Sequence, residues 1–240
     1  MSIKVVLFDM DGNLLPMDQD GFVKAYFKGL AAKLAPCGYE PKALIDAIWA
    51  GTVEMIQNDG KITNEEAFWN CFASRYGEKA LADMPLFEKF YEEDFDAVKA
   101  VCGYNPMAAE TVEKLKKAGI RVALATNPIF PSIATEKRMQ WAGLKPEDFE
   151  FFTTYENSKY CKPNLCYYKE LLKQLDVKPE ECLMVGNDVG DDMVAEALGM
   201  QVFLLTDCLI NKTEKDISRY NNGSFDKLLQ LIGSIKEENL

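Results

Sequence analysis

Short apolar runs alternate with amphipathic stretches of helical spacing along most of the chain. A weak candidate strand lies at Phe151–Thr154, and four stronger runs have the length and β-branched character of buried strands: Val5–Phe8, Ile120–Ala125, Cys182–Val185 and Val202–Leu205. Between the later runs, Pro and Gly signals bound four predicted helices: Met107–Ala118, Ser132–Ala142, Asn164–Leu175 and Asp191–Leu198. Alternation of this kind predicts an α/β fold with a parallel sheet that is covered on both faces.

Residues 17–102 follow a different pattern, because their apolar positions recur only at helical spacing. Turn signals separate four predicted helices: Phe22–Leu34, Ala43–Met55, Glu65–Tyr76 and Leu86–Val98. Thr63 and Glu66 have the spacing of a capping box at the start of the third. We therefore expect an all-helical cap domain at 16–102, inserted after the first strand into an α/β core of 1–15 and 103–240. Hinges are expected near 15–20 and 100–105.

The composition removes several classes of function. A net charge of −11 disfavours nucleic acid and anionic membranes as partners. No apolar run approaches the roughly 20 residues that span a membrane, and no signal peptide is recognisable, so we expect a cytoplasmic protein. The seven cysteines are scattered and form no CxxC pair. Histidine is absent, which excludes Ser-His-Asp and Cys-His catalysis and histidine-bound zinc.

Polar residues gather where the predicted strands end. Asp9 and Asp11 follow the first strand, Thr126 and Asn127 follow the second, and Lys162 opens a later helix. The stretch MVGNDVGDD adds four more at the end of another strand: Asn187, Asp188, Asp191 and Asp192. Ligands bind outside the carboxyl ends of strands in open parallel sheets, so we expect all of these groups to meet at one edge.

The chemistry available to this set is narrow. Several carboxylates at one point need a cation, and an all-oxygen set suits Mg²⁺. Thr126 and Lys162 suit phosphate oxygens. One carboxylate can attack phosphorus, while a neighbouring carboxyl protonates the leaving oxygen and later deprotonates water.

Three segments in order resemble the motifs of the haloacid dehalogenase-like (HAD) hydrolase superfamily, in particular its phosphatases with a helical cap. FDMDGNLL is similar to the family's DxDGT motif, and ATN is similar to its Thr or Ser at a strand end. The run from CKPN to MVGND is similar to the lysine motif, its helix and the acidic fourth motif. The resemblance covers nearly the whole chain and implies a Rossmann-like core.

The resemblance also implies roles. Asp9 is the expected nucleophile that forms an aspartyl-phosphate, and Asp11 is the expected general acid and base. Thr126, Asn127 and Lys162 are expected to bind the phosphoryl group. Mg²⁺ is the expected cofactor, with three expected ligands: Asp9, Asp11 through its backbone carbonyl, and Asp188.

Two positions depart from the family pattern. Asn13 stands in the slot of the motif threonine, where its side chain can hydrogen-bond the loop instead. In the fourth motif, an ungapped comparison puts Asn187 in the metal slot, whereas a shift of one residue puts Asp188 there. We favour Asp188, because a carboxylate binds a hard dication better than an amide does. Asp191 or Asp192 is then left to hold Lys162 or to cap the next helix.

The predicted cap carries 15 acidic and nine basic residues, so its charge does not indicate an anion-binding surface. One or two of its cations remain candidates for substrate contact: Lys24, Lys28, Lys61 and Arg75. We expect its aromatic residues to form the interior of the cap rather than to contact substrate: Phe22, Tyr26, Phe27, Trp49, Phe68, Trp69, Phe72 and Tyr76.

The sequence therefore predicts a Mg²⁺-dependent phosphatase that acts on a small phosphorylated metabolite, as a monomer or homodimer. A phosphomutase on the same scaffold remains an alternative, as does a phosphometabolite-binding module with weakened catalysis. A C–halogen hydrolase is disfavoured, because that branch of the family lacks the second aspartate.

Overall fold

The structure is a computed structural model that describes residues 3–237. Its centre is a sheet of parallel strands in the order β2-β1-β3-β4-β5. The strand bounds are β1 Val5–Phe8, β2 Arg121–Leu124, β3 Cys182–Gly186, β4 Gln201–Leu205 and β5 Asn221–Gly223. The predicted α/β fold with a parallel sheet is confirmed.

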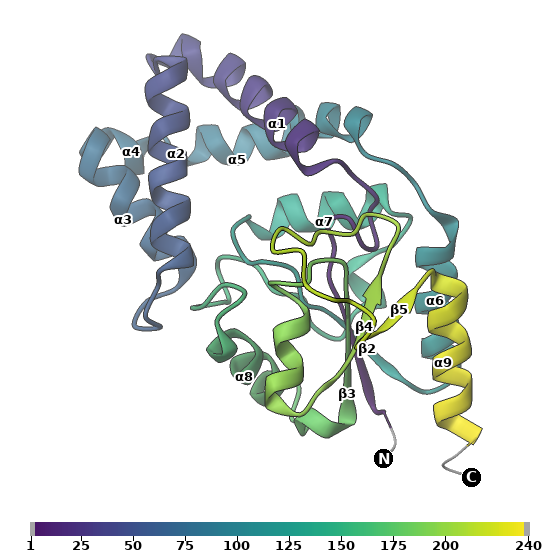
Figure 1. Cartoon of the computed structure of the whole chain (residues 1–240). Helices are drawn as coiled ribbons and strands as arrows, with labels where there is room; N and C mark the ends of the chain where they lie inside the picture. The colour runs from purple at the N-terminus through teal and green to yellow at the C-terminus, as the bar shows by residue number, and fades with distance from the viewer. Residues whose placement is uncertain (1–2, 238–240) are drawn as a thin grey trace.

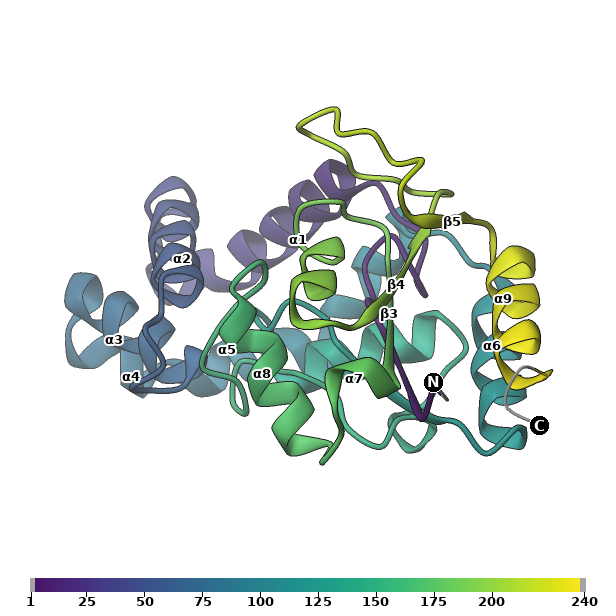
Figure 2. The ribbon, with the colours of Figure 1, turned by 60° about the horizontal axis from the view of Figure 1, so that its bottom comes forward.

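Helices cover both faces of this sheet, because successive strand residues point to opposite sides. Val6 and Phe8 share one apolar cluster with α6 (Pro106–Lys117), α7 (Ser132–Trp141) and α9 (Phe225–Glu237). Val5 and Leu7 share the other with α8 (Leu165–Gln174) and the 3₁₀ helix η5 (Met193–Leu198). Figure 1 shows the sheet between these two layers, and in Figure 2 α6 and α9 lie side by side. Short 3₁₀ turns complete the connections: η3 (Pro146–Asp148) and η4 (Pro179–Glu181).

Residues 16–102 contain helices and no strand, apart from the isolated bridge between Met17 and Cys102 at their base. The helices are α1 (Gln19–Leu34), η1 (Ala35–Cys37), α2 (Pro41–Ile56), α3 (Asn64–Tyr76), α4 (Glu78–Ala82), α5 (Met84–Glu93) and η2 (Phe95–Val101). We call this segment the helical insertion; Figure 1 shows it in purple and blue beside the sheet. The capping box of Thr63 and Glu66 is present at the start of α3.

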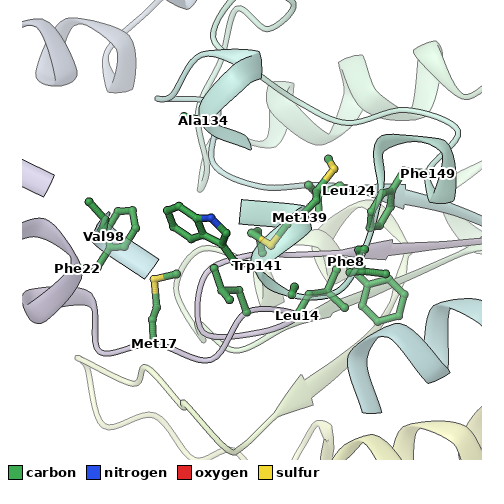
Figure 3. Packing of buried hydrophobic residues seen from close by; sticks show 14 of the residues in the cluster. Phe8, Leu14, Met17, Phe22, Val98, Leu124, Ala134, Met139, Trp141 and Phe149 are labelled. Carbon is green, nitrogen blue, oxygen red and sulfur yellow. The ribbon is translucent and has the colours of Figure 1, made fainter. Parts of the chain in front are cut away.

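The two crossings between the core and the insertion run side by side. Met17 and Cys102 form the isolated bridge, and the Gly103 amide donates to the Pro16 carbonyl at 2.7 Å. Above them, Phe22 and Val98 pack beside Trp141 of α7, with Met17 near them (Figure 3). The base of the insertion and one face of the sheet therefore belong to a single apolar cluster.

Three predicted elements differ from the structure. The expected helix Asp191–Leu198 is only the 3₁₀ helix η5, because the residues before it form a loop bonded to Asp192. Phe151–Thr154 makes one bridge to Leu124 rather than a strand. The helix expected at Leu86–Val98 ends at Glu93 and resumes as the 3₁₀ helix η2.

All seven cysteines are unpaired thiols. Within residues 3–237, no helix combines the length and the hydropathy that a membrane span would need.

Candidate active site

The first strand delivers Asp9 to the carboxyl edge of the sheet, next to β3. The Asp9 amide donates to the Val185 carbonyl at 2.9 Å, which continues the ladder by one residue. The chain then turns sharply at Gly12, whose φ is +80°. A Cβ at Gly12 would lie 2.5 Å from Asn187 Nδ2, so only glycine allows this loop to approach the fourth motif so closely.

Lys162 joins two carboxylates in the floor of the site. Its Nζ donates to Asp9 Oδ1 at 2.9 Å and to Asp192 Oδ1 at 2.6 Å, and the residue is 3% exposed. Burial acts to lower the pKa of Lys162, but the carboxylates of Asp192 and Asp9 outweigh it and raise that pKa. Burial raises the pKa of Asp9, and Lys162 opposes this effect. Each charge is therefore taken out of water against an opposite partner.

Asp192 organises the loop of the fourth motif as well as holding Lys162. Its Oδ2 accepts from the amides of Asn187 and Asp188, both at 3.0 Å, and the side chain is buried. Burial raises the pKa of Asp192 to about 6, whereas Lys162 acts against that rise. Of the two acids that the sequence left open for holding Lys162, the structure places Asp192 there. Asp191 lines the same site, and burial raises its pKa to about 6.

Asn13 joins the first loop to β3, since its Nδ2 donates to the Val185 carbonyl at 3.1 Å. Its Oδ1 is buried without a hydrogen-bond partner among the described residues. The contact made by this amide is thus with strand β3, not with its own loop, and it uses the side-chain nitrogen.

The second motif follows β2, the strand that pairs with β1. Thr126 is buried, and its carbonyl accepts from the hydroxyls of Thr153 at 2.7 Å and Tyr167 at 2.9 Å. Asn127 Oδ1 accepts from the Lys162 amide at 3.2 Å, so the second motif and the lysine motif are directly bonded. Both Thr126 and Asn127 line the cavity that Asp9 faces.

Arg138 is a partner of Asp11 that sequence reasoning missed. This α7 residue is completely buried, and its Nη1 donates to Asp11 Oδ2. Its Nε donates to the Ala134 carbonyl at 3.2 Å, and its guanidinium lies 4.7 Å from the Phe130 ring centroid. Asp11 Oδ1 has no partner among the described residues. A single arginine on an amphipathic helix gives no sequence signal of burial, because it is indistinguishable from a solvated position.

In the fourth motif, the side-chain oxygen Asp188 Oδ1 is hydrogen-bonded, whereas Asn187 Oδ1 is not. Asp188 Oδ1 accepts from the amides of Gly190 at 2.6 Å and Asp191 at 3.0 Å, so this oxygen holds the turn. Asn187 Nδ2 donates to the Cys208 carbonyl at 2.8 Å, which leaves Asn187 Oδ1 buried without a partner in the described part of the chain. Both residues line the cavity. Lys212, which the sequence did not single out, lines it as well.

The cavity has a volume of about 270 Å³ and runs from these polar groups into the helical insertion. Six of the aromatic residues expected to form the interior of the insertion line it: Phe22, Tyr26, Phe27, Trp49, Phe68 and Trp69. Four of these six are also buried in the apolar cluster that includes the insertion, so they belong both to its interior and to the cavity wall: Phe22, Tyr26, Phe68 and Trp69. Phe72 and Tyr76 instead pack around Tyr39. None of the four candidate cations of the insertion is among the described residues of the cavity wall.

Comparison with known proteins agrees with this geometry. A family model described as haloacid dehalogenase-like hydrolase matches residues 3–199, which is most of the chain. The chain belongs to the HAD-like hydrolases. Within this family it is 26% identical over 238 residues to a glyceraldehyde 3-phosphate phosphatase of Methanothermobacter thermautotrophicus (strain Delta H). That alignment covers 98% of this chain and 99% of the relative.

Two solved structures show the same fold as this HAD-like hydrolase. The 2-haloacid dehalogenase of Pseudomonas syringae pv. Tomato DC3000 superposes with a TM-score of 0.63 at 20% identity, covering 97% of this chain and 99% of that one. The HAD-hydrolase YfnB of Bacillus subtilis, in a structure bound to magnesium, superposes with a TM-score of 0.55 at 16% identity, again covering 97% and 99%.

The donor atoms of this HAD-like hydrolase fit a hard cation only as a mixed oxygen set. Among residues 3–237, no three Asp, Glu, Cys or His side chains converge closely enough to hold a metal ion by themselves. Of the buried side-chain oxygens without partners among the described residues, three belong to the loops around Asp9: Asp11 Oδ1, Asn13 Oδ1 and Asn187 Oδ1. Buried oxygens without donors are costly, and carboxyl, amide and carbonyl oxygens together are suitable ligands for Mg²⁺.

Proposed function

We propose that this HAD-like hydrolase is a Mg²⁺-dependent phosphatase that cleaves a phosphomonoester through an aspartyl-phosphate on Asp9. The observation that carries the proposal is the contact of Lys162 with Asp9 and Asp192, beside Thr126 and Asn127. A pair of buried carboxylates with one lysine has no use in packing, because desolvation of the charges offsets their attraction. In the wall of a cavity, the same group can attack and hold a phosphoryl group.

Asp9 supplies the nucleophilic oxygen. An Asp9 carboxylate oxygen forms a bond to phosphorus while the bond from phosphorus to the alcohol oxygen of the substrate breaks. The Lys162 ammonium, already 2.9 Å from Asp9 Oδ1, offsets the negative charge that accumulates between the two groups. Thr126 and Asn127, which follow the neighbouring strand β2, donate to the phosphoryl oxygens.

Asp11 transfers the protons. Its carboxyl gives a proton to the departing alkoxide, so the alcohol leaves neutral. The resulting Asp11 carboxylate then takes a proton from water, whose oxygen bonds to phosphorus as the bond to Asp9 breaks, and inorganic phosphate is released. Arg138 holds Oδ2, so the partnerless Oδ1 is the atom free for both transfers.

Mg²⁺ would be held by the Asp9 carboxylate, the Asp11 backbone carbonyl and Asp188, with Asn187 Oδ1 as an alternative ligand. When bound, it would neutralise charge on the phosphoryl oxygens. Magnesium in the YfnB structure supports this choice of metal.

The helical insertion, residues 16–102, would serve as a cap that excludes water and selects the substrate. A phosphorylated small molecule is the substrate class, as in the M. thermautotrophicus relative that is named for glyceraldehyde 3-phosphate. We infer a cytoplasmic enzyme from the unpaired cysteines and from the small-molecule chemistry of the site.

The test is release of phosphate from p-nitrophenyl phosphate with and without Mg²⁺. We expect turnover that depends on Mg²⁺ and falls by about 10³-fold or more in Asp9→Asn, because the amide is not a nucleophile for phosphorus. Asp226→Asn is the matched control: it makes the same change at an exposed aspartate of α9, away from the cavity, and should leave turnover unchanged. Undiminished turnover in Asp9→Asn would exclude Asp9 as the nucleophile.

A further inference from the structure

The helical insertion gives the cavity a wall of rings rather than of charges. Phe22, Tyr26 and Phe27 come from α1, Trp49 comes from α2, and Phe68 comes from α3. Aliphatic and aromatic residues of the loop after β2, including Ile129 and Phe130, complete this wall, and the Phe130 ring contacts Tyr26 with the ring centroids 5.4 Å apart. We call this part of the cavity the aromatic chamber; it is continuous with the polar floor at Asp9 and Lys162.

Polar atoms of the chamber wall are largely bonded to each other. The hydroxyls of Tyr26 and Tyr91 share a hydrogen bond of 2.8 Å, and the Thr52 hydroxyl donates to the Ile48 carbonyl at 2.9 Å. A ligand in the chamber therefore meets ring faces and edges, with few groups that could replace the hydrogen bonds of a polar molecule. A sugar or a glycerol backbone would lose its hydration here without compensation.

Trp69 places a buried donor in the wall of the chamber. Trp69 Nε1 is buried without an acceptor in hydrogen-bonding geometry among the described residues. The Trp69 indole lies near the Tyr155 hydroxyl. Burial raises the pKa of Tyr155, and the contact with Trp69 acts against that rise. The chamber can thus accommodate a single acceptor atom on an otherwise apolar group.

Charges that would bind a second anion are also missing from the chamber. Of the described residues that line the cavity, the lysines are Lys162 and Lys212, both at the polar floor, and no arginine lines it. The acid that belongs to the insertion is Glu88 of α5. A carboxylate or a second phosphate on the substrate would be desolvated beside rings and an acid, without a cation to offset it.

We propose that the alcohol part of the substrate is uncharged, mainly apolar and large enough to carry an aromatic ring, which binds in the aromatic chamber. The proposal rests on the proposed phosphatase function and adds the class of leaving group to it. The volume of about 270 Å³ is sufficient, because a dry apolar cavity of roughly 150 Å³ accepts benzene. Ring burial also supplies binding that does not depend on the phosphoryl group.

Two esters with equally poor leaving groups test this directly: 3-phenylpropyl phosphate and propyl phosphate. Their alcohols differ little in acidity, so a difference in kcat/KM reports binding of the phenyl group. We expect the phenyl ester to be preferred about 30-fold, equivalent to about 2 kcal/mol. A preference below about threefold, or a preference for propyl phosphate, would overturn the chamber assignment while leaving the phosphatase function intact.

Failure of the proposed function gives a different result, in which neither ester is hydrolysed. The chamber is then tested by calorimetric binding of 4-phenylbutylphosphonate and butylphosphonate, which retain the dianion and cannot be hydrolysed as phosphate esters. Tighter binding of the phenyl compound by about 30-fold supports the chamber, and equal affinity refutes it.

The variant Trp49→Ala tests whether the phenyl group of the ester binds in the aromatic chamber. Trp49 is 47% exposed, so its removal spares the interior of the insertion, and we expect the preference for the phenyl ester to fall about fivefold. Ile56→Ala is the control, because Ile56 is on the same helix, is 46% exposed and does not line the cavity. An unchanged preference in Trp49→Ala, or an equal fall in Ile56→Ala, would contradict binding in the chamber.

Discussion

The cavity has two walls that differ in the kind of side chain they bury. One, at the sheet edge, buries charged groups, and the other, in the insertion, buries aromatic rings. At the sheet edge, Lys162, Asp9 and Asp192 are buried as charges and each depends on the others. In the insertion, Phe22 and Phe68 are buried rings that need no partner to be out of water. We therefore expect the charged wall to tolerate few substitutions and to determine the reaction. The ring wall can be substituted to suit a substrate with little loss of stability.

The strongest test of this contrast is Lys162→Met. It leaves Asp9 and Asp192 facing each other in a buried site with no cation between them, so we expect the free energy of unfolding to fall by about 3–5 kcal/mol. Phosphatase activity should be lost together with stability. Urea denaturation followed by circular dichroism measures the first, and release of phosphate measures the second.

Lys159→Met is the control for this variant. It removes an exposed lysine from the same loop, and its effect should stay within about 0.5 kcal/mol. If Lys162→Met cost no more than Lys159→Met, the buried charges would not depend on one another, and the contrast between the two walls would disappear.

The sequence predicts which charged residues line the cavity but not which aromatic residues do, for a physical reason. Asp9, Thr126 and Lys162 follow short apolar strands or precede a helix, so parallel topology alone brings them to one edge. Helical spacing predicts that Phe22 and Trp49 share faces with other apolar residues, but it does not say which helix or cavity those faces meet. The spacing therefore predicts that these rings are interior, as Phe22 and Phe68 are, but not that they also line the cavity.

Other features escaped prediction because their signals are tertiary. Arg138 is buried with Asp11 as its partner, and Asp11 lies 127 positions away in the sequence. Strand β5 has the sequence Asn221–Gly223 without an apolar pattern, and its pairing with β4 determines its conformation. The choice between Asp191 and Asp192 required the geometry of the loop, since both follow the motif within one residue of each other.

A milder test addresses the ring wall through its one hydroxyl pair. Tyr26→Phe leaves the buried Tyr91 hydroxyl without its 2.8 Å partner, so we expect a loss of about 1–2 kcal/mol in the free energy of unfolding. The double variant Tyr26→Phe, Tyr91→Phe removes both polar groups and should be within about 0.5 kcal/mol of the unmodified protein. Urea denaturation of the four proteins in this cycle measures the coupling.

A double variant that loses as much as the sum of the single losses would mean that the rings depend on their hydroxyls, as the charges at the sheet edge depend on one another. The two walls would then not differ in the way we describe.

The smallest change in activity is expected for Asn13→Thr, which restores the family residue at the junction of the charged wall with β3. Asn13 contributes one hydrogen bond, from Nδ2 to the Val185 carbonyl at 3.1 Å, and its Oδ1 is buried without a partner. The threonine hydroxyl can donate in its place, and it brings no amide oxygen that lacks a donor. We therefore expect kcat/KM for p-nitrophenyl phosphate to stay within about tenfold, which is about 1.4 kcal/mol in the barrier.

Asn13→Ala supplies the comparison, since it leaves the Val185 carbonyl without a side-chain donor and should lower stability by about 1 kcal/mol. A gain much larger than tenfold in Asn13→Thr would mean that asparagine weakens catalysis in this protein, and a role in binding phosphorylated ligands would then explain the site better than turnover does.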